Sequence, residues 1–118
     1  MRIVGIDPGK TTGVCRFEDN RFISGDALIE YSAIGDYIII SCPDIIVMED
    51  FIVSRRPAEA RWPFMVMGVI EYVATVPVVY QSPSILKLML PKVLHLSSNP
   101  HVRSACAHVM YYWLSKRS

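Results

Sequence analysis

The sequence has no long hydrophobic run, no secretion signal and no cysteine pattern typical of disulfides or zinc sites. No segment approaches the ~18 consecutive uncharged apolar residues of a membrane-spanning helix. The N-terminus lacks a basic segment followed by an apolar core. The cysteines, Cys15, Cys42 and Cys106, are odd in number, widely spaced and set in apolar surroundings, as reduced cysteines are. These absences predict a cytoplasmic protein that does not contact a membrane.

Acidic residues are absent from residues 72–118. All eleven Asp and Glu residues lie in residues 1–71, which carry a net charge of −4, whereas residues 72–118 carry +5. The three histidines, His95, His101 and His108, also lie in the basic part. This distribution fits a chain that holds a cation at one end and a polyanion at the other, and chance segregation is the alternative.

The chain is long enough for one domain, spanning residues 1–118. Its patterning predicts the order β-β-β-α-β-α-β-α-α, and therefore a mixed α/β sheet of five strands flanked by helices. Pro91 is expected to end the third helix, and Pro63 to kink the second helix or to mark its first turn. The expected strands are 2–7, 14–17, 21–24, 45–48 and 76–80, and the expected helices are about 27–41, 58–74, 85–90 and 101–115.

Two apolar strands each end in an acidic residue. Asp7 ends the first strand in the segment RIVGIDPGKTTGV, and Glu49 with Asp50 follows the strand after the first helix. Strands on either side of a helical crossover are commonly adjacent and parallel, so Asp7 and Glu49 are expected to face each other. Two carboxylates so close favour a divalent cation such as Mg²⁺ or Mn²⁺ between them. The alternatives are an aspartate that caps its own turn and a solvated acidic pair.

The last helix places His101, Ser104 and His108 on one face, because they are spaced three and four residues apart. Its other side is an apolar stripe that is expected to pack on the sheet. A neutral His101 at the start of this helix suits a metal ligand or a group that orients water, and an ordinary surface histidine is the alternative.

Three segments in this order, GIDPG with its following T-G, VMED and HVRSACAH, resemble the RuvC-like Holliday-junction resolvases, and most closely their small phage-encoded branch. Residues 54–60 and 81–84 also resemble that branch. The resemblance implies the ribonuclease H-like fold, with a five-stranded mixed sheet flanked by helices. It also implies a homodimeric, Mg²⁺-dependent endodeoxyribonuclease that cuts Holliday junctions or other branched DNA and leaves a 5′-phosphate and a 3′-hydroxyl.

The resemblance implies two Mg²⁺ or Mn²⁺ ions per site, with Asp7 bridging both and Glu49 binding one. His101 fits a position that holds an acidic residue or histidine in the family. Ser104 departs from the family, which has an aspartate there, and its hydroxyl is a much weaker ligand, so the second ion is expected to bind weakly. Three explanations are open: an inactivated variant, a natural relative that does not cleave, or an enzyme that completes the site with Asp50 or water.

Basic residues and an apolar helix provide candidate contacts with partners. The helix Trp62–Ile70 is apolar on nearly all sides, which indicates either a homodimer interface or a central core helix. The candidate phosphate contacts, which would position DNA rather than read its sequence, are Lys10, Arg55, Arg56, Lys87, Lys92 and Arg103.

Two further functions compete with the nuclease. Ser104 favours a module of the same fold that binds branched DNA without cutting it. A glycine, an aspartate and a second glycine followed by threonine also open phosphate-binding ATPase and sugar-kinase lobes. Those enzymes close two lobes over the nucleotide, whereas 118 residues provide only one.

Overall fold

The computed structural model describes residues 1–50 and 57–117, and it describes side chains at residues 1–50 and 61–116. A single five-stranded sheet has the order β3-β2-β1-β4-β5. Strand β1 pairs antiparallel with β2 and parallel with β4, and β4 pairs parallel with β5. The strands are β1 (Arg2–Asp7), β2 (Thr12–Glu18), β3 (Arg21–Leu28), β4 (Ile45–Glu49) and β5 (Val78–Gln81). The helices are α1 (Tyr31–Ser41), α2 (Pro57–Val73), α3 (Leu86–Val93) and α4 (Pro100–Arg117), and a 3₁₀ turn, η1 (Pro83–Ile85), precedes α3.

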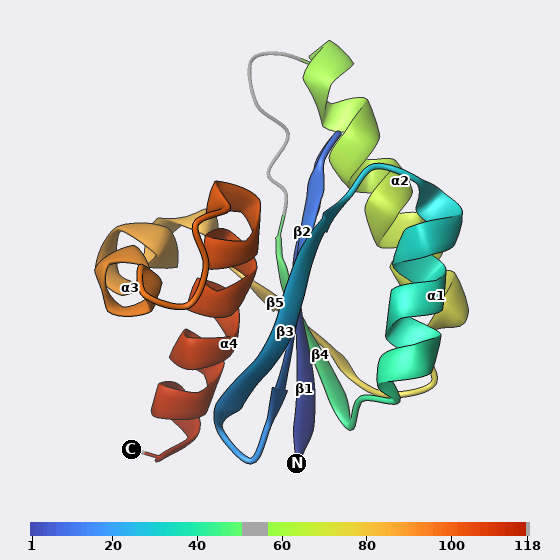
Figure 1. Ribbon diagram of the computed structural model, residues 1–118. Helices are drawn as coiled ribbons and strands as arrows, with labels where there is room; N and C mark the ends of the chain where they lie inside the picture. The colour runs from blue at the N-terminus through green and yellow to red at the C-terminus, as the bar shows by residue number, and fades with distance from the viewer. Residues whose placement is uncertain (51–56, 118) are drawn as a thin grey trace.

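Helices cover both faces of the sheet (Figure 1), which confirms the predicted α/β class with a mixed sheet. Helices α1 and α2 cover one face, while α4 covers the other and carries α3 on its outer side. The α1/α2 face is closed by large aliphatic side chains, which bury apolar surface between the two layers. Its buried cluster is Val4, Ile6, Val14, Ile34, Ile38, Ile46, Met48, Val66 and Ile70.

The α4 face is built differently, because glycines in three neighbouring strands let the helix lie directly on the sheet. A Cβ on Gly5 would lie 2.5 Å from the Ala105 carbonyl oxygen, and a Cβ on Gly13 would overlap the His101 main chain. Gly13 pairs with Asp7 across β1 and β2. The start of α4 is therefore held over the strand end that carries Asp7.

The order of strands and α-helices predicted from the sequence is the observed one, but three predicted limits are wrong by three residues or more. Strand β3 runs to Leu28 and α1 begins only at Tyr31, because Ala27 and Leu28 continue the ladder with β2. Pro91 lies inside α3 rather than ending it. Helix α3 packs against α4 through buried Met89 and Val93. This packing lets the helix tolerate the loss of the one backbone hydrogen bond that proline cannot donate.

The second helix also contains its proline, since α2 starts at Pro57 and Pro63 lies within it. No helix in the described part of the chain is both long and apolar enough to cross a membrane.

Candidate active site

Three polar side chains end adjacent strands on the α4 face of the sheet. Ile6 and Met48 belong to the α1/α2 core, so the next residues along β1 and β4, Asp7 and Glu49, point to the opposite face. Gln81 ends β5 and pairs directly with Glu49. The carboxyl ends of three parallel strands thus bring two carboxylates and an amide under the first turns of α4, as the sequence predicted for Asp7 and Glu49.

The electrostatics of Asp7 show that the two carboxylates are close. Burial, the negative charge of Glu49 and a hydrogen bond with Glu49 raise the pKa of Asp7 from its ordinary value of 3.8 to about 7. A hydrogen bond with the Ser104 side chain acts in the opposite direction. Two carboxyl groups in contact share a proton or a cation, because both cannot be ionised without a large cost. Ser104, as predicted, lies beside Asp7.

His108 contacts two of these strand-end side chains, and its own side chain is fully buried. Its Nε2 lies 3.1 Å from Oε1 of Glu49, and its Nδ1 lies 2.9 Å from Oε1 of Gln81. The sequence placed His108 on the same helix face as Ser104 but gave it no role. The four-residue spacing from Ser104 was the available signal, whereas nothing in the sequence identified Gln81 as its second partner.

The start of α4 is fixed by capping. The side-chain oxygen of Asn99 accepts hydrogen bonds from the backbone N–H groups of His101 at 2.9 Å and Val102 at 3.3 Å. This cap satisfies two amides of the first helical turn. His101 is half-buried and its main chain lies against Gly13, but within the described chain its imidazole forms no hydrogen bond or ion pair. His101 therefore lies at the correct end of the helix and stays a candidate ligand.

The donor set fits one hard cation. Mg²⁺ is commonly held by one or two carboxylates together with water and substrate phosphate. Asp7 and Glu49 can supply the two carboxylates. Among the described residues, no three His, Cys, Asp or Glu side chains are arranged as a metal site. Asp50 does not join the pair: it is exposed, its N–H donates to the Gln81 carbonyl, and its charge acts on Tyr80. Among the residues that the structure describes, no third carboxylate is placed to bind a second ion at this site.

Tyr80 marks the opposite face of the same strand end. Its hydroxyl donates to a carboxylate oxygen of Glu71 on α2. Partial burial, together with the charges of Glu71 and Asp50, raises the pKa of Tyr80 to about 12. Asp50 and Glu71 therefore act on Tyr80 rather than on the Asp7–Glu49 pair.

The predicted phosphate contacts are distributed over several elements. Lys10 is exposed three residues after Asp7, and Lys87 and Lys92 are exposed on α3. Arg103 is half-buried, and its Nε donates to the Ser97 carbonyl, so it also holds the loop before α4. Arg55 and Arg56 lie outside the described residues.

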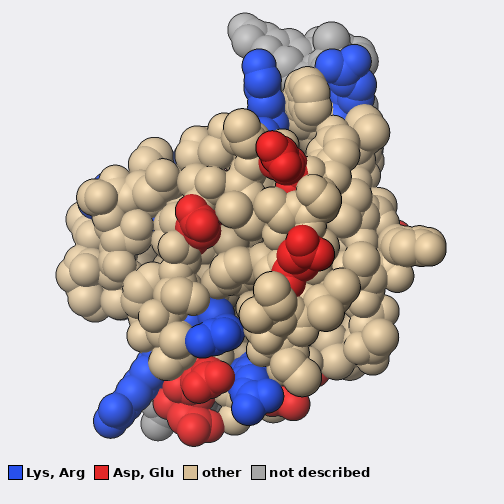
Figure 2. All heavy atoms as spheres, turned by 45° about the vertical axis from the view of Figure 1, so that its right-hand side comes forward, with Lys and Arg blue, Asp and Glu red and all other residues tan. Residues whose placement is uncertain are grey.

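The two ends of the molecule differ in charge arrangement (Figure 2). On the face shown, basic side chains stand at the upper end, where Figure 1 places the carboxyl end of β1. At the lower end acidic and basic groups pair locally, as the N-terminus does with Asp19 at 2.8 Å and Arg2 with Glu18 at 3.3 Å. At the lower end these charges lie beside a partner of opposite sign, whereas Asp7 and Glu49 at the upper end are two acidic groups facing each other.

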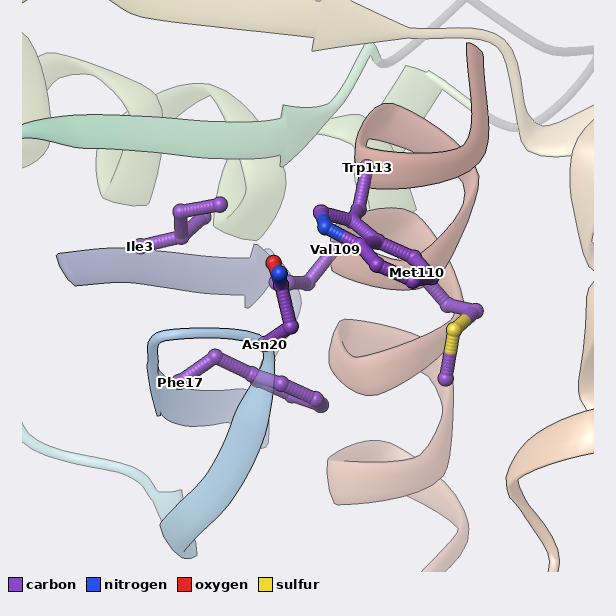
Figure 3. A pocket seen from close by; sticks show the side chains of 6 residues that line it. All are labelled: Ile3, Phe17, Asn20, Val109, Met110 and Trp113. Atoms are coloured by element: carbon purple, nitrogen blue, oxygen red, sulfur yellow. The ribbon is translucent and has the colours of Figure 1, made fainter. Parts of the chain in front are cut away.

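An apolar pocket lies away from this site (Figure 3). It is formed between the later turns of α4 and the start of β1, the end of β2 and the turn between β2 and β3, at the opposite end of the sheet from Asp7. Its lining residues are Ile3, Phe17, Asn20, Val109, Met110 and Trp113. With no charged side chain in its lining, it offers nothing to the carboxylate pair.

The topology and the strand-end acids have the form of a ribonuclease H-like fold, and comparison with solved structures confirms it. The chain superimposes on RuvC of Thermus thermophilus in complex with a Holliday junction substrate, with a TM-score of 0.77 and 18% identity, over 92% of this chain and 89% of that chain. It also superimposes on the fowlpox virus Holliday junction resolvase, with a TM-score of 0.68 and 13% identity, over 98% and 99% of the two chains. By sequence, no protein family and no curated protein matches this chain. The predicted resemblance to RuvC-like resolvases therefore holds in the fold.

Proposed function

We propose that this chain is a metal-dependent, structure-selective endonuclease of branched DNA, such as Holliday junctions, acting in the bacterial or phage-infected host cytoplasm. The observation that carries the proposal is the contact of Asp7 with Glu49 at the ends of parallel strands, beneath α4, in a chain with the fold of known resolvases. The likeness extends over nearly the whole length of this chain and of those resolvases. Because those resolvases match this one-lobe chain over nearly their whole length, the match disfavours the two-lobed ATPase or sugar-kinase alternative.

Each residue of the site has a task in this proposal. Asp7 and Glu49 would hold the first Mg²⁺ or Mn²⁺, with His101 as a further ligand and a second ion bound weakly. Bound cations supply the activation of the attacking water and the stabilisation of the leaving 3′-oxygen. Asp7 would hold the cation as a carboxylate, because a positive charge between the two acids would take the place of the proton that they share. The Ser104 side chain lies beside Asp7, but its hydroxyl donates to the Pro100 carbonyl at 3.1 Å and adds no negative charge.

The proposed substrate contacts are electrostatic. Lys10, beside Asp7, and Lys87 and Lys92, on α3, would neutralise phosphates and position the DNA. A homodimer through the helix Trp62–Ile70 would present two such sites to the two halves of a junction. Phe64 and Met65 are half exposed on α2, whereas Val66 and Ile70 pack on the sheet, so one side of this helix is apolar and accessible.

The test compares binding and cleavage of a four-way junction with those of a linear duplex of equal length, with Mg²⁺ or Mn²⁺. We expect preferential junction binding that falls steeply with salt, because phosphate contacts release counterions. We expect slow cleavage by the natural sequence, faster cleavage by Ser104→Asp, and none by the Asp7→Asn, Ser104→Asp double variant. Equal binding to junction and duplex, or cleavage that survives Asp7→Asn, contradicts the proposal.

Ser104 favours a second candidate function, in which the chain binds branched DNA without cutting it. In that case neither the natural chain nor Ser104→Asp cleaves, while junction binding without metal is unchanged. The same experiment therefore separates the binding module from the impaired nuclease.

A further inference from the structure

His108 stands out because a fully buried imidazole contacts oxygen atoms at both ring nitrogens. The two partners come from different strands, Glu49 from β4 and Gln81 from β5, while His108 comes from α4. Most of the surrounding α4 face is apolar, with Ala105, Cys106 and Val109 all buried. A buried polar side chain costs free energy unless its hydrogen bonds are made, so this arrangement joins three elements at one point.

The direction of the hydrogen bonds follows from the groups involved. An ionised carboxylate only accepts hydrogen bonds, so Nε2 of His108 carries the hydrogen and donates to Glu49. A neutral ring then presents a lone pair at Nδ1. The Gln81 amide can serve that nitrogen in either state, because a half-turn presents its N–H₂ to a lone pair or its oxygen to an N–H. Gln81 thereby supports the donation from His108 to Glu49 without requiring a charged imidazole.

The geometry leads us to infer that His108 is a positioning residue for Glu49, with Gln81 holding the imidazole in place. The inference rests on the function proposed above. The bond from Nε2 fixes one oxygen of the Glu49 carboxylate, and the carboxylate is also hydrogen-bonded to Asp7. Since the carboxylate cannot rotate freely, its remaining lone pairs stay directed at the place where a cation would bind. Such support of a ligand typically affects metal affinity by ~10- to 100-fold.

This role differs from that of a histidine that only fills space in the core. A leucine at position 108 retains most of the packing volume but leaves the buried Gln81 amide without its partner, so we expect a cost in stability of about 1–3 kcal/mol. Glu49 would lose its donor, and it can turn toward solvent because its side chain is 15% exposed. Positioning therefore predicts that metal affinity falls in the folded His108→Leu variant and is restored by a side chain that can donate to Glu49, whereas a packing role predicts that the folded variant keeps its metal affinity.

The experiment measures Mn²⁺ affinity by electron paramagnetic resonance of the free ion, below the melting temperature of each variant. We expect His108→Leu to weaken Mn²⁺ binding by ~10- to 100-fold. His108→Gln should stay within about threefold of the natural chain, because its amide N–H₂ can replace Nε2 as donor. The matched control is His95→Gln at an exposed histidine, which should change nothing. Nitrogen NMR of the natural chain should show the Nε2 proton of His108 exchanging slowly with solvent.

The outcomes separate this inference from the proposed function. If the natural chain binds no Mn²⁺, the proposed metal site fails and the role of His108 fails with it. If the natural chain binds Mn²⁺ and His108→Leu binds it equally well, the metal site stands and the positioning role is overturned. The same conclusion follows if His108→Gln loses as much affinity as His108→Leu, or if the Nε2 proton is absent.

Discussion

The two faces of the sheet are covered by helices in two different ways. On the α1/α2 face, side chains such as Ile6, Met48 and Ile70 are fully buried and the helices rest on a layer of aliphatic groups. On the α4 face, Gly5 and Gly13 bring the helix backbone into direct contact with the strands. The first face is a conventional apolar core, whereas the second also carries Asp7, Glu49, Gln81 and His108 at one end.

The α1/α2 face contributes mainly to the stability of the fold, whereas the α4 face fixes the position of a helix relative to the strands. An aliphatic layer can adjust by small side-chain movements, so the helices above it tolerate changes of volume. A helix that touches the strands through glycines has no such layer, and its place is fixed by backbone contact. That fixed place is what brings Ser104 and His108 to the acids at the strand ends.

The largest expected effect comes from adding a methyl group under α4. Gly13→Ala would place a Cβ inside the His101 main chain, and backbone cannot move aside as a side-chain end can. We expect loss of folding or more than about 4 kcal/mol of destabilisation, measured by chemical denaturation. Ile70→Ala, on the other face, should cost roughly 2–5 kcal/mol and leave a folded chain whose site is intact. If Gly13→Ala is as mild as a surface substitution, the contrast between the faces is wrong.

A second test concerns pH, because the α4 face contains a carboxyl group that is unfavourable when ionised. The pKa of Asp7 is raised to about 7 in the folded chain, so the folded state holds its proton where the unfolded state has lost it. The contribution of Asp7 to stability without metal should therefore be greatest below pH ~4 and be lost as the pH rises to ~7, by up to ~4 kcal/mol. Denaturation in EDTA across this range measures it.

Asp7→Asn removes the charge and should abolish most of this dependence, leaving the variant more stable than the natural chain near neutral pH. The control is Ile70→Ala, which should lower stability by the same amount at each pH. A parallel dependence in the natural chain and in Asp7→Asn would assign the effect to other groups.

The sequence revealed the strand-end acids because apolar runs deliver them, and the run before Glu49 differs little from the run before Asp7. The end of β3 was missed because Gly25, Asp26 and Ala27 have low strand propensity, and only pairing with β2 keeps them extended. The predicted end of α3 at Pro91 was wrong because packing against α4 compensates for one lost hydrogen bond. These are cases in which contacts distant in sequence override local preference.

Within the site, the helix period correctly placed Ser104 on the side of Asp7, because three- and four-residue spacings are fixed by helix geometry. The same period could not reveal that His108 meets Glu49 and Gln81, since that contact depends on the distance between α4 and the sheet. The glycines set that distance, and their effect is visible only once the strands are paired. Asp50 looked equivalent to Glu49 in sequence, yet the side chain one step further along the strand acts on Tyr80.

A third prediction sharpens the comparison at position 104. Ser104→Asp adds a carboxylate beside Asp7 and Glu49, which should lower stability in EDTA and increase the rise in melting temperature caused by Mg²⁺ or Mn²⁺. One added charge at ~4 Å corresponds to at most ~10³-fold in metal affinity. Ser104→Asn is the matched control, since it has nearly the same size without the charge. Equal metal-induced shifts in both variants would mean that position 104 does not face the cation.

The smallest expected effect lies on the outer side of the α1/α2 layer. Gly68 is exposed within α2, and in the described part of the chain a Cβ there would meet no atom within 4 Å apart from the backbone of its own helix and its chain neighbours. In an isolated chain, Gly68→Ala should stabilise by ~0.5–1 kcal/mol, because alanine favours helix. A second copy packed on Trp62–Ile70 through close backbone contact would instead meet the new methyl group.

We expect sedimentation to show a dimer of about twice 13.4 kDa for the natural chain and weaker association for Gly68→Ala. Tyr72→Ala, at an almost fully exposed side chain beyond this segment, should leave the association unchanged. If the natural chain sediments as a monomer at micromolar concentration, the predicted dimer is wrong, and α2 serves only to cover the sheet of its own chain.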